Sequence, residues 1–131
     1  MSTLDKYMEE MVQDTSVDNF NLLDIQMKLP AIKHKWVGRL MRHKYEVKEL
    51  RKEKELLIRE LTIKLISESP VKIAEPIAEK KVSKVDSVLK IDAKIKETYL
   101  VIEYLEKVEK IFSSMTFDIK NVTEIMKLET T

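Results

Sequence analysis

Five basic side chains recur at helical spacing in the middle of the sequence: Lys44, Lys48, Arg51, Lys52 and Arg59. Residues three, four or seven apart lie on one side of an α-helix, so these cations form one basic flank. At a rise of 1.5 Å per residue the flank covers about 22 Å. Because Lys and Arg in such a row can neutralise successive phosphates of one strand, the five are candidate DNA-binding residues.

Acidic side chains lie on the other flank of the same predicted helix. They are Glu46, Glu49, Glu53 and Glu60, whereas Glu55 interrupts the basic flank. This separation of charge has a second interpretation, in which the basic flank of one subunit meets the acidic flank of the next. Both interpretations stay open, and both could hold at different ends of the helix.

Two aromatic residues near the basic flank differ in their predicted exposure. Trp36, in Lys-His-Lys-Trp, could stack on a base, but its place on the apolar side of the helix favours core packing. Tyr45 falls on the side that faces solvent. It is therefore the better candidate for an exposed aromatic.

The sequence offers little for other kinds of chemistry. There is no Cys, and His34 and His43 lie nine residues apart, so we expect no disulfide and no metal site. The single glycine, Gly38, excludes a glycine-rich phosphate loop and points to no cofactor. No serine has a base in a recognisable arrangement, so we expect no catalytic residue and no enzyme.

Composition indicates one helical domain. The chain has 131 residues, a net charge of +1, 36% charged and 44% hydrophobic residues. No segment approaches the roughly 20 apolar residues of a membrane span, and residues 1–10 do not form a signal peptide. We expect a soluble, intracellular protein without membrane contact.

The near-neutral total hides three segments of different charge. The net charge is −4 over residues 1–29, +6 over 33–64 and −1 over 65–131. A neutral protein can still bind a polyanion if one element concentrates the positive charge. The acidic N-terminal segment could either neutralise basic residues of the same chain or bind a basic partner.

Apolar periodicity and turn residues predict helices in the first half of the chain. A short helix over 4–13 would be capped by Thr3, and a second would begin at Asp18, include Phe20 and end at Pro30. A long helix over about 30–66 follows. Its heptad-like apolar seam, interrupted by His43 and Lys54, consists of Trp36, Leu40, Val47, Leu50, Leu57 and Leu61.

The second half is predicted to begin with an exposed loop over 67–82, because it contains Pro70 and Pro76. Ser83 would cap a helix that runs to about 114, and a last helix would cover 117–128. Six of the seven residues in 99–105 are apolar, which indicates burial by other subunits. The expected fold is all-α, with four or five helices and one long central basic helix, assembled into a homo-oligomer.

The order of several segments resembles the UvsY recombination mediator family of T4-like phages, over nearly the whole chain. The similar segments are the acidic opening from Leu4-Asp5 through Glu9-Glu10 to Asp14, then Lys35-Trp36, Leu57-Ile58-Arg59-Glu60-Leu61, Val88-Leu89-Lys90-Ile91-Asp92, Phe117-Asp118-Ile119-Lys120 and Met126-Lys127-Leu128-Glu129. Arg59 matches one position of the family's basic pair. Leu61 stands at the second, which leaves Lys48, Arg51 and Lys52 to compensate.

This resemblance implies a non-enzymatic recombination mediator in the cytoplasm of the infected host cell. Such a protein forms a helical ring of six or seven subunits, binds single-stranded DNA, weakens the phage single-strand-binding protein on it and loads a RecA-like recombinase of the UvsX type. We accordingly expect residues 1–66 to bind single-stranded DNA and 83–131 to drive oligomerisation. The alternative is a helical scaffold or adaptor that self-assembles without binding DNA.

Overall fold

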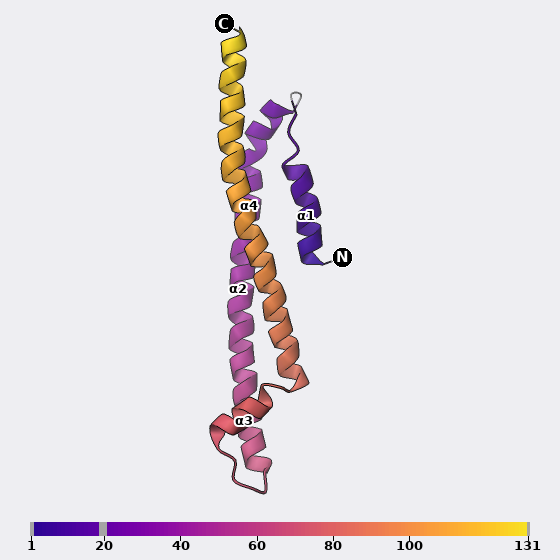
Figure 1. Ribbon diagram of the computed structural model, residues 1–131, viewed down its shortest axis with the longest axis vertical. Coiled ribbons are helices and arrows are strands. Elements are labelled where there is room, and N and C mark those ends of the chain that lie inside the picture. Colours follow the sequence, from indigo (N-terminus) through magenta and orange to yellow (C-terminus); the bar gives the residue numbers. More distant parts are fainter. Residues whose placement is uncertain (1, 19–20, 131) are drawn as a thin grey trace. The chain divides into compact units, whose positions relative to one another are not determined.

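The computed structural model describes residues 2–18 and 21–130, with only the backbone of residue 130. It contains four α-helices and, within these residues, no strand. They are α1 (Thr3–Asp14), α2 (Leu22–Glu68), α3 (Glu75–Val82) and α4 (Asp86–Thr130) (Figure 1). The expected all-α class, with a long central basic helix, is confirmed.

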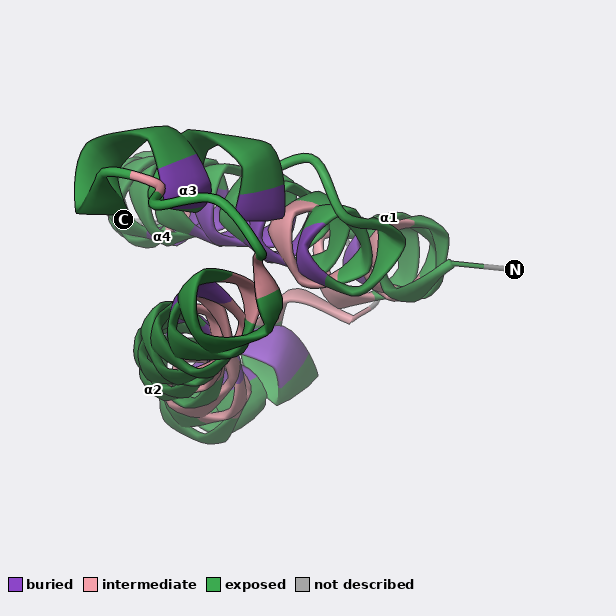
Figure 2. Cartoon of the chain, turned by 90° about the horizontal axis from the view of Figure 1, so that it is seen from below, coloured by how far each residue is buried: buried purple, intermediate pink, exposed green. Residues whose placement is uncertain are grey.

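The chain divides into two compact units. Residues Met1–Arg42 and Leu100–Thr131 form the first unit, and His43–Tyr99 form the second. Exposed residues cover most of each helix, and the buried ones occupy limited parts of it (Figure 2). In the second unit the buried side chains are Val47, Leu50, Thr62, Ala78, Val82, Val88, Ile95 and Thr98.

The N-cap of helix α1 lies one residue before the expected one, so the helix begins at Thr3. The hydroxyl of Ser2, not that of Thr3, accepts a hydrogen bond from the backbone N–H of Asp5 at 3.1 Å. The carboxylate of Asp5 in turn accepts a hydrogen bond from the backbone N–H of Ser2 at 3.4 Å, which completes a capping box. This reciprocal pair fixes the N-terminus of α1.

Helix α2 includes Pro30, so the expected helix boundary at this residue is wrong. Proline inside a helix costs about 3 kcal/mol. The preceding turns bury Ile25 and Leu29, and each fully buried aliphatic side chain contributes about 1.5–3 kcal/mol, which offsets that cost. Asp18 does exchange hydrogen bonds with Asn21 just before the helix, whereas Phe20 lies outside the described residues.

Helix α3 lies inside the segment expected to be an exposed loop, so that expectation is wrong for residues 75–82. Pro76 occupies the first turn, where a missing N–H costs nothing, and it therefore favours the helix. Ala78 and Val82 are buried and anchor it. Ser83 ends α3 and donates to the carbonyl of Lys80, so it does not cap the following helix as expected.

Helix α4 is continuous through the expected break near Ser113 and Thr116. The hydroxyls of both residues donate to carbonyls four residues earlier, which satisfies them within the helix. Phe112 and Ile119 are buried on either side of this point and hold the helix in register. Two predicted helices are therefore one.

The apolar segment 99–105 is covered largely by its own chain. Val101, Ile102 and Leu105 are buried, with Leu105 only 2% exposed. Leu100 remains 53% exposed. Burial by other subunits is therefore not needed for most of the segment, and Tyr99 and Leu100 are its apolar residues that remain exposed.

Candidate nucleic-acid interface

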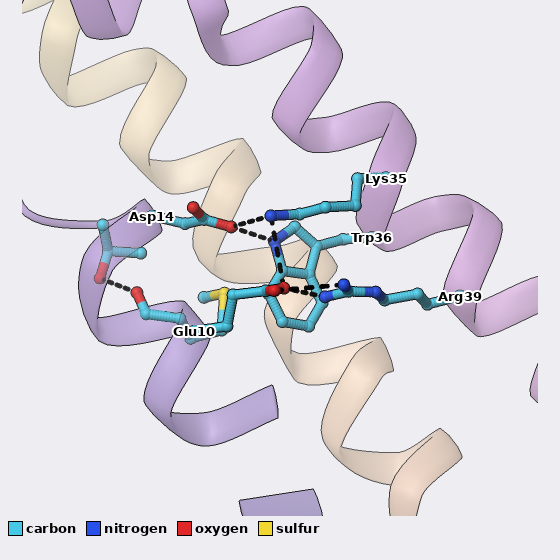
Figure 3. A network of polar contacts seen from close by, with 7 residues as sticks. Glu10, Asp14, Lys35, Trp36 and Arg39 are labelled. Atoms are coloured by element: carbon cyan, nitrogen blue, oxygen red, sulfur yellow. Dashed lines mark hydrogen bonds and ion pairs between the residues drawn. The ribbon is translucent and has the colours of Figure 1, made fainter. Parts of the chain in front are cut away.

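Helix α1 brings two carboxylates against the start of the basic region in the first unit (Figure 3). Asp14 accepts a hydrogen bond from the ammonium of Lys35 at 2.6 Å, and Glu10 lies 3.3 Å from the same ammonium. Glu10 also forms a bidentate pair with Arg39. The acidic N-terminal segment thus neutralises basic residues of its own chain, one of the two roles left open by the sequence.

These pairs change the titration of both partners. The hydrogen bond from Arg39 lowers the pKa of Glu10, an effect that burial partly opposes. The same hydrogen bond raises the pKa of Arg39. Both groups are therefore charged at neutral pH, and the positive charge of Arg39 is already matched before any ligand arrives.

Trp36 belongs to this network and is part of the core, as the helical seam predicts. Its side chain is 3% exposed, and its indole N–H donates to Asp14 at 2.8 Å. The ring packs edge-on against Tyr7 with centroids 5.5 Å apart, and Arg39 lies over its face. A buried and fully contacted indole has no free face for a base.

The basic flank lies in the second unit and is exposed along its length. All five of its predicted members are exposed on α2: Lys44, Lys48, Arg51, Lys52 and Arg59. Lys52 contacts Glu49 at 3.4 Å, an exposed pair of small energetic value. Within residues 2–18 and 21–129, no carboxylate lies within 4.0 Å of the other four charged groups.

This arrangement separates two classes of cation on α2. Lys35 and Arg39 are neutralised by α1, whereas the five cations of the basic flank are exposed to solvent. Tyr45 lies among them and is 67% exposed, as predicted. The open flank can bind a polyanion without first breaking a buried ion pair.

The polar residues that interrupt the apolar seam have partners. Lys54 donates to Asp92 of α4 at 2.8 Å. That hydrogen bond lowers the pKa of Asp92 and keeps its carboxylate charged. His43 contacts Glu46, one turn along the same helix, at 3.1 Å. These side chains stabilise the second unit locally, and Lys54 is thereby removed from the cations available to a ligand.

One contact of the basic flank has no counterpart in the sequence pattern. The guanidinium of Arg51 lies over the ring of Tyr99 of α4, 5.9 Å from its centroid. The two residues are 48 positions apart, and periodicity along α4 places Tyr99 simply on an apolar face. Only the packing of the second unit brings them together.

Two further findings bear on the class of site. No group of three or more His, Cys, Asp and Glu side chains gathers in a way that could hold a metal ion among the residues that the structure describes. In the same part of the chain, no helix has the length and apolar character needed to cross a bilayer. The open basic flank is the candidate site.

Comparison with known proteins identifies similar sequences and folds. The model of a family described as "Recombination, repair and ssDNA binding protein UvsY" matches residues 10–131. No curated protein sequence matches the chain.

Among solved structures, crystal structures of the bacteriophage T4 recombination mediator protein UvsY have a similar fold. One, of lattice type IV, has a TM-score of 0.81 at 16% identity and covers 98% of this chain and 99% of that one. Another, of lattice type II, has a TM-score of 0.80 at 17% identity and covers 100% of both chains. A third, of lattice type I, has a TM-score of 0.77 at 17% identity, with 93% and 97% covered.

Proposed function

The chain belongs to the UvsY family of recombination, repair and single-stranded-DNA-binding proteins, and from this premise we propose that it binds single-stranded DNA through the basic flank of α2. The observation that carries the proposal is that Lys44, Lys48, Arg51 and Arg59 are exposed without a carboxylate partner in the described part of the chain. Phosphates of a flexible strand are the ligands that such a row of cations favours.

Several copies of the chain would strengthen this contact. Three exposed apolar residues of α4 in the first unit lie eleven positions apart, namely Leu100, Ile111 and Val122. Eleven residues are three helical turns, so the three side chains follow one line along the helix. We propose that this line packs against a second copy, in a ring of six or seven subunits. Residues 83–131 thus serve oligomerisation and 1–66 DNA binding.

A ring of weak sites gives tight total binding. Each basic flank contributes a few phosphate contacts, and their linkage in one particle raises the effective concentration of strand at the next flank. Such binding can yield stepwise to a competitor. It suits a non-enzymatic mediator that weakens a phage single-strand-binding protein on DNA and loads a RecA-like recombinase of the UvsX type, in the cytoplasm of an infected host cell.

The direct test is the salt dependence of binding to labelled oligo-dT, measured by fluorescence anisotropy. Each phosphate neutralised on a single strand adds about −0.7 to the slope of log affinity against log salt. Replacing Lys48, Arg51 and Arg59 together by Ala is expected to make the slope shallower by about 2. A wild-type slope near zero would contradict the proposal.

Matched controls separate DNA binding from the scaffold alternative. The control is a triple variant in which three exposed lysines of α4 are replaced by Ala, namely Lys90, Lys94 and Lys110. It is expected to keep the wild-type slope of log affinity against log salt. Light scattering on the same samples gives the particle mass. If the basic-flank variant loses mass and has no DNA-specific defect, its charges pair protein with protein, and the adaptor function is the correct one.

A further inference from the structure

A groove opens in the second unit beside the basic flank. Its volume is about 420 Å³, and α2 and α4 supply its lining. Ile58 and Ile95 give it an apolar surface, whereas Arg51 and Tyr99 lie together at its edge. The groove therefore combines a place for an apolar ring with an adjacent cation.

Tyr99 is available for a ligand. Its side chain is 41% exposed, and the contact with Arg51 is loose, with 5.9 Å between guanidinium carbon and ring centroid. Within the described residues the phenol oxygen has no hydrogen-bond partner. Aromatic rings and guanidinium planes are the two side-chain surfaces on which nucleobases stack.

The remaining charges of the groove are largely balanced by one another. Asp92 lies between two ammonium groups, at 2.8 Å from Lys54 and 3.4 Å from Lys96. Glu55 is an exposed carboxylate on the rim. Arg51 is the cation of the groove that has no carboxylate within 4.0 Å in the described part of the chain, so its guanidinium can bind a phosphate.

We propose that Tyr99 and Arg51 form a stacking subsite for one nucleobase of a single strand. The base lies against the ring of Tyr99, while Arg51 and Lys48, one helical turn away, hold the adjoining phosphates. This inference rests on the proposed function, because the strand reaches the groove along the basic flank. The subsite adds to the affinity for single-stranded DNA a contribution from base stacking, beside the contribution from the charge of the phosphate backbone.

The test compares two labelled strands of equal length, oligo-dT and an abasic deoxyribose-phosphate oligomer, over a range of salt concentrations. Wild-type protein is expected to bind oligo-dT about 5- to 150-fold more tightly, the range for stacking of one base. Tyr99→Leu is expected to remove this preference without changing the salt slope. Tyr99→Phe keeps the ring and is expected to keep the preference. Arg51→Ala is expected to make the slope shallower by about 0.7.

Tyr45→Leu serves as the matched variant, since Tyr45 is exposed on the same flank but does not line the groove. It is expected to leave the base preference unchanged. Particle mass from light scattering is expected to equal that of wild type for all variants.

Other results overturn the inference. Equal wild-type binding of both strands, with a normal salt slope, refutes the subsite and leaves DNA binding intact. Wild-type binding of neither strand refutes the proposed function and the subsite together. Loss of preference in Tyr45→Leu but not in Tyr99→Leu places stacking at Tyr45. A lower particle mass for Tyr99→Leu makes Tyr99 an assembly contact.

Discussion

Asp14 holds together the contact between α1 and α2 in the first unit, and its replacement gives a worked prediction. Asp14→Ala leaves the indole N–H of Trp36 without an acceptor in a site that is 3% exposed. A buried unsatisfied donor costs about 1–3 kcal/mol. Loss of the partly exposed pair with Lys35 adds about 0–1 kcal/mol. We expect the free energy of unfolding to fall by about 1–4 kcal/mol.

Two companion variants separate the causes. Asp14→Asn keeps an oxygen that can accept from Trp36 but loses the charge, so we expect a loss of about 1 kcal/mol. Glu103→Ala removes an exposed pair with Lys107 on α4 and is expected to cost less than about 0.5 kcal/mol.

Urea unfolding measures all three variants at one fixed protein concentration, because the self-association proposed above would make stability depend on concentration. Trp36 is the only tryptophan of the chain, so its fluorescence reports directly on this contact. An unfolding free energy for Asp14→Ala that matches Glu103→Ala would refute the reasoning. It would mean that the hydrogen bond to Trp36 does not anchor α1.

Three further predictions follow from single side chains. The pKa of Glu10 is lowered by Arg39, so its stabilising contribution is complete above its ordinary value of 4.5 and disappears as the pH falls through the lower folded value; Glu10→Gln is expected to remove this part of the acid dependence of the melting temperature. Within the described residues the buried hydroxyl of Thr62 has no hydrogen-bond partner, so Thr62→Val is expected to stabilise the protein by about 1 kcal/mol in urea unfolding, and destabilisation would show that the hydroxyl is satisfied. Leu100→Glu is expected to give smaller particles in light scattering than Lys110→Glu, and an equal mass would exclude Leu100 from the assembly contact.

The sequence alone determined the fold class and the position of the candidate site. Apolar residues at helical spacing identify a long amphipathic helix, and the same spacing separates the basic flank from Trp36 and its seam. These are properties of one helix, so periodicity is sufficient to predict them. The family resemblance, drawn from short segments in a fixed order, is confirmed by the family match over residues 10–131.

Helix boundaries depended on tertiary packing. Pro30 and Ser113 are local signals of a break, yet both lie inside continuous helices. The burial of neighbouring side chains outweighs a local preference against helix of about 1–3 kcal/mol. The partners that bury them are distant in the sequence, so a local pattern does not reveal them. Pro76 differs from Pro30, because it is predicted to be part of a loop but lies in the first turn of α3, a position that proline favours.

Contacts between distant residues were decided by the tertiary structure alone. Asp14 meets Trp36, and Arg51 meets Tyr99, across 22 and 48 positions of chain. In the first contact Asp14 accepts from the indole N–H of Trp36 and also pairs with the ammonium of Lys35. The second contact places the ring of Tyr99 beside the guanidinium of Arg51. A sequence can show that a helix carries many cations. Which of them keep their charge available depends on the carboxylates that folding brings within reach.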